Sequence, residues 1–181
     1  FGFDELFTAV NFVGAESAWK TASTSINFNN HVGYSLLARL TEQAFGRSEW
    51  SIRLPALILG LATLPSLWWY ARRVVSPMLA LSTTLALALA PEHIRWCTTA
   101  RGYTALLLGA ILTSGLLFHL LKRPNPRIAA VYAVVTALAT YCHLYMATVA
   151  AVQGLVLVAW MVIHRRERNR WRGALLGLGA L

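Results

Sequence analysis

The sequence is poor in charged residues, and above all in acidic ones. Asp, Glu, Lys and Arg make up 13% of its 181 residues, whereas they account for about a quarter of a soluble domain. The shortage excludes an ordinary soluble domain with a charged surface. What is abundant is apolar, because 57% of the residues are hydrophobic and the mean hydropathy is positive. We therefore expect an integral membrane protein.

The sequence also lacks a cluster of metal-binding residues. It has two cysteines and five histidines, and none of them follows the spacing of a zinc site. We expect no metal and no cofactor. We expect Cys97 and Cys142 to be small, mostly apolar residues at helix ends, although a disulfide between them is conceivable.

Basic residues outnumber acidic ones by sixteen to seven, for a formal net charge of +9. In a soluble chain such an excess would suggest nucleic-acid binding. Here the basic residues fall in short blocks between apolar segments, which is the pattern that orients membrane helices. The charge therefore indicates membrane topology, and no nucleic-acid partner is expected.

Long apolar segments dominate the chain after residue 53. Leu54–Ala71 contains no charged residue; Trp50 precedes it, and Trp68 and Trp69 near its end are followed by Arg72, as at the two interfaces of a membrane span. The block 128–163 is too long for one crossing and has basic residues at both ends, so we expect a helical hairpin that turns near 142–145. The expected fold class is all-α, a polytopic transmembrane helix bundle with interfacial amphipathic helices in its first extracytoplasmic loop. Spans are expected near 54–71, 77–97, 102–121, 128–143 and 146–163, with the start of another at 173.

One of these spans is ambiguous. The apolar run after Pro77 reaches Pro91 in too few residues for a normal crossing. Either the helix continues through a kink at Pro91, or it ends below the surface in a polar cavity.

The distribution of charge predicts the orientation in the membrane. Ten of the sixteen Lys and Arg residues fall in the short loops that would be cytoplasmic, and six of the seven acidic residues fall on the other side. Residues 1–53 are expected to form an extracytoplasmic loop and 54–181 a helix bundle. Because the chain begins at Phe1 and its last residues resemble an incomplete span, we expect it to be a fragment of a longer protein that holds a single, truncated domain.

Polar and ionisable residues collect at the expected extracytoplasmic face. Such a collection fits a site for a charged substrate at the membrane surface, although interfacial loops are also polar without any function. The residues are Asp4, Glu5, His31, Arg53, Glu92, His93, Arg95, Arg101, Tyr103 and His143.

Two motifs make this pattern specific. The first is Phe-Gly-x-Ser-Glu-Trp-Ser-x-Arg-Leu-Pro over 45–55, and the second is Ala-Arg-Gly-Tyr over 100–103. With the preceding acidic pair Asp4-Glu5, they resemble the polyprenyl-phosphate-sugar-dependent glycosyltransferases of the GT-C superfamily, in the branch of bacterial protein mannosyltransferases and aminoarabinose transferases. The chain departs from that pattern at 31–34, where the family often has His-Pro-Pro-Leu-Tyr, and at 97–101, where it often has Ser-Gln-Glu-Ala-Arg.

The resemblance implies Asp4 as the catalytic base, with Glu5 orienting it or binding the acceptor. Transfer from a lipid phosphate also needs cations that hold the phosphate as it leaves, a task suited to the forked donors of arginine. We expect Arg53 and Arg101 to bind the donor phosphate, with Arg95 as a weaker candidate. Arg53 could instead anchor its helix at the head groups. His31, Tyr34, His93 and Tyr103 are the expected substrate-binding residues, and His31 could equally cap its helix.

The expected function is therefore a multi-pass cell-membrane glycosyltransferase with an extracytoplasmic active site. Its partners would be a polyprenyl-phosphate sugar donor, the lipid bilayer and an acceptor of unknown class. The alternative is a transporter or flippase of lipid-linked or amphiphilic solutes, which should carry ionisable groups at the bilayer midplane. The expected spans have none there, which favours the enzyme. A structural membrane subunit is a third possibility, but it leaves the polar residues unexplained.

Overall fold

A computed structural model describes residues 2–23 and 31–164, and this part of the chain is entirely helical. The expected all-α fold is confirmed. The elements are α1 (Phe3–Thr8), the π-helical turn η1 (Ala9–Val13), α2 (Ala18–Ser23), α3 (Val32–Phe45), α4 (Glu49–Ala71), α5 (Pro77–Leu89), α6 (Pro91–Cys97), α7 (Tyr103–Lys122), α8 (Pro126–Cys142) and α9 (Met146–Ile163).

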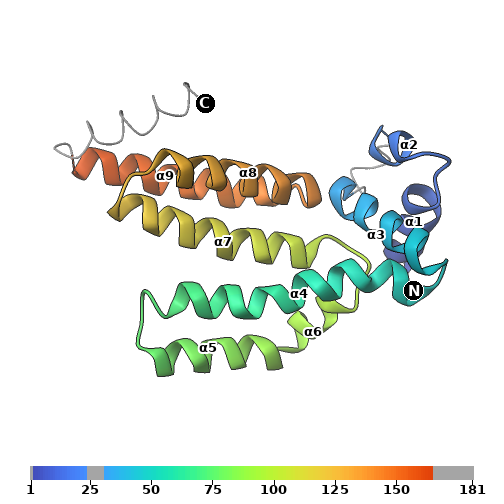
Figure 1. Cartoon of the computed structure of the whole chain (residues 1–181), viewed down its shortest axis with the longest axis horizontal. Helices are drawn as coiled ribbons and strands as arrows, with labels where there is room; N and C mark the ends of the chain where they lie inside the picture. Colours follow the sequence, from blue (N-terminus) through green and yellow to red (C-terminus); the bar gives the residue numbers. More distant parts are fainter. Residues whose placement is uncertain (1, 24–30, 165–181) are drawn as a thin grey trace.

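The long helices lie side by side, and α7 packs between α4 and α8 (Figure 1). The short helices α1 and α2 gather with α3 at the end of the bundle where α4 begins. Among the described residues, α4, α7 and α9 are long and apolar enough to cross a membrane, whereas α5 and α8 are apolar but shorter. The bundle thus has two ends, one covered by α1–α3 and one formed by the turns α4–α5 and α7–α8.

Helix α4 begins at Glu49, earlier than the apolar run alone predicts. The Ser48 side chain accepts a hydrogen bond from the Ser51 N–H, and the Ser51 hydroxyl accepts one from the Ser48 N–H. This reciprocal cap satisfies backbone groups at the helix start. The cap extends the helix so that Arg53 lies on its first turns, beside α1.

The segment 77–97 does not form one continuous helix. Helix α5 ends at Leu89, Ala90 has an extended conformation (φ −66°, ψ 123°), and Pro91 begins the separate helix α6. Proline disfavours a helical conformation of the residue before it and lacks the N–H that would continue the helix. Helix α6 packs against α4 and leads into the loop before α7.

A small buried core fixes the N-terminal helices to the bundle. It joins residues of η1, α3, α4 and the loop before α7, namely Ala9, Val13, Tyr34, Ala38, Ile52, Ala56 and Ala100. Arg39 of α3 reinforces it by donating a hydrogen bond to the Val13 carbonyl, with an N–O distance of 3.0 Å. This packing holds α1 and the residues around Ala100 at the same end of the bundle.

Candidate active site

The Glu5 carboxylate connects three segments that are far apart in the sequence. Glu5 is buried in α1, and Arg53 of α4 donates two hydrogen bonds to it, from Nε to Oε1 (3.0 Å) and from Nη2 to Oε2 (2.9 Å). The backbone N–H of Ala100, in the loop between α6 and α7, donates a third to Oε1 (2.6 Å). A bidentate pair of this kind fixes both orientation and distance. Glu5 therefore sets the position of α1 relative to the residue that precedes Arg101.

The charge of Glu5 is stabilised by these partners. Burial raises the pKa of the carboxyl, but the hydrogen bonds from Arg53 and from the N–H groups of Ala100 and Gly2 outweigh it and hold the pKa below its ordinary value of 4.5. Glu5 is consequently ionised near neutral pH. An ionised, fully paired carboxylate is unsuited to take up a proton, so its position favours a structural task over that of a base.

Replacing Glu5 with glutamine is expected to lower the free energy of unfolding at neutral pH by about 1–3 kcal/mol, because charge-assisted hydrogen bonds to Arg53 become neutral ones. In the wild type this carboxylate stabilises the fold above pH 4.5, and its contribution is lost as the pH falls through the lower folded pKa. The variant should therefore lose less stability on acidification. Thermal unfolding of the purified protein at neutral and acidic pH measures both effects. Glu92→Gln, which removes an exposed carboxylate paired with Arg95 within α6, is the control and should leave both nearly unchanged.

A second cluster surrounds Arg101, immediately after Ala100. The Arg101 side chain is 6% exposed, and its Nε and Nη1 have no hydrogen-bond partner within the described part of the chain. The rings of His31 and His143 lie beside it, tilted by 38° with centroids 4.4 Å apart, and the Tyr103 ring centroid lies 5.1 Å from that of His143. Because a buried guanidinium without partners is costly, this arrangement favours an anionic ligand at Arg101.

Both histidines of the cluster are neutral near pH 7. Burial, the charge of Arg101 and the neighbouring His143 lower the pKa of His31 to about 3, and burial and Arg101 also lower the pKa of His143. Nε2 of His31 has no hydrogen-bond partner among the described residues.

In His143 a hydrogen bond fixes which nitrogen carries the proton. Its Nδ1 accepts a hydrogen bond from the Tyr145 N–H (3.3 Å), so the proton of the neutral ring is on Nε2. Nε2 of His143 likewise has no partner among the described residues. The cluster thus presents donors on His143 and Arg101 beside the unpartnered Nε2 of His31. A phosphate ester next to a hydroxyl group would satisfy all of them.

Two glycines allow the elements of this cluster to meet at the turn after α8. A Cβ atom on Gly33, in the first turn of α3, would lie 2.6 Å from the Cys142 Sγ, and one on Gly102 would overlap the Cys142 carbonyl oxygen. Both positions therefore require the absence of a side chain. The close approach places His31 and Arg101 on either side of the segment that carries His143.

The variant Gly102→Ala is expected to lower the free energy of unfolding by about 1–3 kcal/mol, because its new methyl group must displace backbone rather than a flexible side chain. Gly154→Ala is the matched control, since a Cβ there meets no atom within 4 Å and alanine favours the helix. The measurement is the thermal unfolding midpoint of both variants beside the wild type. Equal midpoints for Gly102→Ala and the wild type would show that α7 does not need this close contact.

An apolar cavity of about 480 Å³ leads away from the cluster between α3, α7 and α8. Gly33 and Cys142 form its end near His31 and His143, and Leu112 and Val135 line it further along α7 and α8. A cavity with almost wholly apolar walls suits a hydrocarbon chain. Its position next to Arg101 places an apolar channel beside a buried cation.

Asp4 lies on α1 next to Glu5, but its side chain is exposed. Successive residues of a helix point about 100° apart, so the two neighbouring carboxyls face different surroundings. The structure therefore separates the expected acidic pair into a buried carboxylate that holds Arg53 and an exposed one that remains accessible.

Three other expected site residues lie outside the cluster. Tyr34 is fully buried and its hydroxyl donates to the Ile52 carbonyl (2.8 Å), so it packs α3 on α4. His93 is buried between α6 and α4, where its Nε2 is 2.9 Å from the Thr63 hydroxyl. Arg95 is exposed and pairs with Glu92 within α6. Of the expected substrate-binding residues, the structure brings together His31 and Tyr103.

His143 belongs to the cluster; it was counted with the polar residues of the expected extracytoplasmic face but was assigned no catalytic or binding role. The local sequence carried one weak indication of this role, which was the presence of a histidine in the predicted hairpin turn. Its importance depends on the contacts of His31, Tyr103 and Arg101, which the sequence around residue 143 does not encode. The two cysteines are free, Cys97 beside His93 and Cys142 at the turn.

A helix bundle with helices of spanning length, and with a buried arginine beside two histidines at one end, defines a membrane protein that gathers polar residues at one end of the bundle. The chain belongs to the dolichyl-phosphate-mannose-protein mannosyltransferase family, whose model matches residues 32–181. This confirms the resemblance seen in the sequence and places the chain in a family of membrane glycosyltransferases. The matched segment includes Arg53, Arg101 and His143 and begins after Asp4 and Glu5. No curated protein and no solved structure matches the chain.

Proposed function

We propose that this protein transfers a sugar from a polyprenyl-phosphate donor to an acceptor hydroxyl at the extracytoplasmic membrane surface. The observation that carries the proposal is the buried guanidinium of Arg101, with two nitrogens that have no partner among the described residues, next to Gly102, which packs against Cys142 at the end of an apolar cavity. A polyprenyl phosphate has both complementary parts, an anionic group for Arg101 and a hydrocarbon chain for the cavity. The family match supports the same donor class.

Arg101 takes the principal contact with the donor phosphate in this proposal. Arg53 was the other expected phosphate ligand, but its guanidinium is engaged by Glu5 and by Glu49 (3.4 Å). We assign Arg53 to holding Glu5, and Glu5 to holding the backbone before Arg101. The His143 Nε2 proton adds a second donor to the phosphate, and the His31 Nε2 forms a hydrogen bond with a sugar hydroxyl.

The reaction then proceeds by one substitution. The acceptor oxygen attacks the anomeric carbon, the bond from that carbon to the phosphate oxygen breaks, and the phosphate leaves with the electron pair. Asp4 takes the proton of the acceptor hydroxyl, for which its exposed carboxylate on α1 is accessible. Arg101 stabilises the negative charge that develops on the leaving phosphate.

The test supplies membranes that contain the protein with the same radiolabelled sugar on three carriers: polyprenyl phosphate, polyprenyl diphosphate and a nucleotide. Product is expected from the polyprenyl phosphate, because the cluster fits one phosphate beside a hydrocarbon chain. Sealed vesicles that hold the protein in either orientation test on which side of the membrane the active site lies. Label should be transferred where the α1–α3 end of the bundle faces the added acceptor. Movement of the intact donor across the bilayer, with no new glycosidic bond, would instead indicate the transporter.

A further inference from the structure

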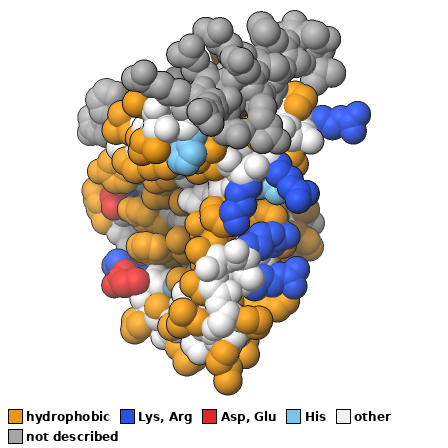
Figure 2. Space-filling view, turned by 90° about the vertical axis from the view of Figure 1, so that its left-hand side faces the viewer, with side chains coloured by type: hydrophobic (Ala, Val, Ile, Leu, Met, Phe, Trp, Pro, Cys, Tyr) orange, Lys and Arg blue, Asp and Glu red, His pale blue; other side chains and the backbone are white. Residues whose placement is uncertain are grey.

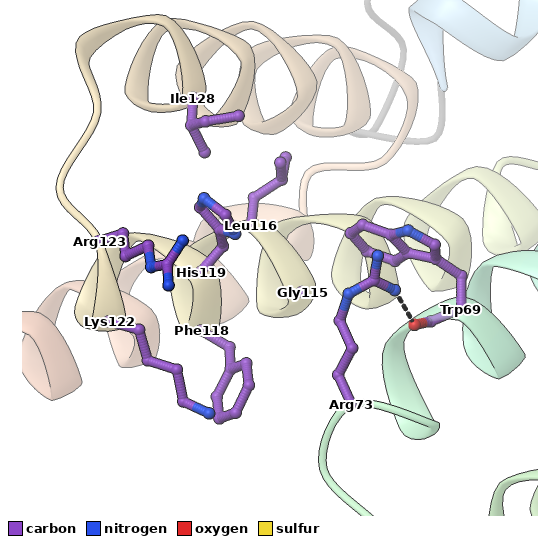
Figure 3. Close-up of a pocket in the computed structure, with 9 residues that line it drawn as sticks. All are labelled: Trp69, Arg73, Gly115, Leu116, Phe118, His119, Lys122, Arg123 and Ile128. Atoms are coloured by element: carbon purple, nitrogen blue, oxygen red, sulfur yellow. Dashed lines mark hydrogen bonds between the residues drawn. The ribbon is translucent and has the colours of Figure 1, made fainter. Parts of the chain in front are cut away.

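A second cavity lies at the opposite end of the bundle from Glu5 and Arg101. It has a volume of about 540 Å³ and is formed where α4 ends, α7 ends and α8 begins (Figure 3). The side chains of Arg73, His119, Lys122 and Arg123 line it. Figure 2 shows Lys and Arg side chains gathered on this end of the molecule, among apolar ones.

The cations of this cavity are positioned by aromatic rings. The Arg73 guanidinium carbon lies 4.1 Å from the centroid of the Trp69 ring, and the same side chain donates a hydrogen bond to the Trp69 carbonyl. The Lys122 Nζ lies 4.1 Å from the centroid of the Phe118 ring. Such contacts orient a cation without neutralising its charge.

Gly115 of α7 makes room for this arrangement. A Cβ atom at this position would lie 2.5 Å from the Trp69 ring, so the glycine allows the indole to lie against α7 and to carry Arg73 toward the cavity. None of Arg73, Lys122 and Arg123 forms an ion pair within residues 2–23 and 31–164. The charges are thus gathered, oriented and uncompensated by described acids.

The remaining walls are apolar, with Leu116, Ile128 and the ring of Trp69 beside the cations. The cavity lies at the end of α7, a helix of spanning length, and so at the boundary between the apolar and polar zones of a bilayer. Ordinary basic residues at helix ends extend separately into the head groups. Here they converge with apolar side chains on a single hollow.

We propose that this cavity binds the phosphate-bearing head group of an anionic phospholipid, with the start of an acyl chain against Leu116 and Ile128. The lipid supplies the negative charge that the cations lack and covers the apolar wall. The site is separate from the proposed donor site, and its occupant is a component of the membrane itself.

Native mass spectrometry of the protein, titrated with phosphatidylglycerol or phosphatidylcholine, tests this proposal. Wild type is expected to bind phosphatidylglycerol more tightly, and Arg73→Gln with Arg123→Gln should weaken that binding by about fivefold for each cation removed. Arg127→Gln is the matched control, because Arg127 is exposed at the same end of the bundle but does not line the cavity. Arg123→Lys keeps the charge and should retain binding.

Several outcomes would overturn the proposal. Equal affinity for the two lipids would remove the charge-dependent site, as would an equal loss of affinity in Arg127→Gln and the double variant. If glycerol phosphate competes as strongly as the intact lipid, the cavity binds a soluble phosphate and the apolar wall has no part. Circular dichroism in detergent checks that the double variant is folded. If the double variant is not folded, Arg123→Lys supplies the comparison with wild type.

Discussion

Replacing Arg101 with alanine is expected to lower kcat/KM for the polyprenyl-phosphate donor by about 100-fold. The reason is the loss of two charge-assisted hydrogen bonds from Nε and Nη1, each contributing about 1.5 kcal/mol in a site shielded from water. Much of the effect should lie in KM, because the phosphate is bound before it leaves, and the remainder in kcat. The measurement is the initial rate of sugar transfer as a function of donor concentration.

Arg95→Ala is the matched control for this variant. It removes an arginine from the neighbouring helix α6, but that side chain is exposed and paired with Glu92. We expect kcat/KM within about twofold of wild type. A similar loss in both variants would mean that positive charge near the surface, rather than the buried position of Arg101, determines donor binding.

Replacing Asp4 with asparagine is expected to reduce kcat by about 1,000-fold or more. Asparagine has the same shape but cannot take the proton of the acceptor hydroxyl, and general-base catalysis contributes roughly 100- to 10,000-fold. KM for the donor should change little, because Asp4 does not contact the phosphate in the proposed mechanism. Steady-state transfer with saturating acceptor separates the two constants.

Glu16→Gln is the control for Asp4. Glu16 is another exposed acid of the N-terminal segment, and it pairs with Lys20 at 3.0 Å. It should retain wild-type transfer. Full activity of Asp4→Asn would remove Asp4 from the role of base, and Glu5, which is paired with Arg53 and Ala100, is not placed to replace it.

Much of the helical architecture follows from composition and length. The uncharged run from Leu54 to Ala71 is long enough to favour a helix that satisfies its own backbone in an apolar environment, and α4 covers it. Pro91 ends the preceding helix for a local steric reason that the sequence displays. The sequence could not place the short helix α6, because its position depends on packing against α4.

The site could be predicted only in part, because its geometry arises from contacts between distant segments. For neighbouring acids such as Asp4 and Glu5, the sequence does not indicate which of the two carboxylates will pair with Arg53. Tyr34 carries a hydroxyl of the kind that binds substrates, yet this hydroxyl donates a hydrogen bond to the Ile52 carbonyl of α4. His143 enters the cluster through the close approach of Gly33 and Gly102 to the turn after α8.

The two cavities lie at opposite ends of the bundle and differ in the chemistry of their surroundings. The cavity near Arg101 has a long apolar wall, whereas the one beside Arg73 has several exposed cations and a shorter wall. A donor with a hydrocarbon chain suits the first, because its phosphate would meet the buried Arg101, where each hydrogen bond is stronger. A lipid that only binds suits the second.

The most direct measurement is an experimental structure of the protein with a non-transferable polyprenyl phosphonate bound. The phosphonate is expected within hydrogen-bonding distance of Arg101 Nε and Nη1, with its chain between α7 and α8 along Leu112 and Val135. Binding of the phosphonate at the opposite end, among Arg73, Lys122 and Arg123, would contradict the assignment of Arg101 as the ligand of the donor phosphate.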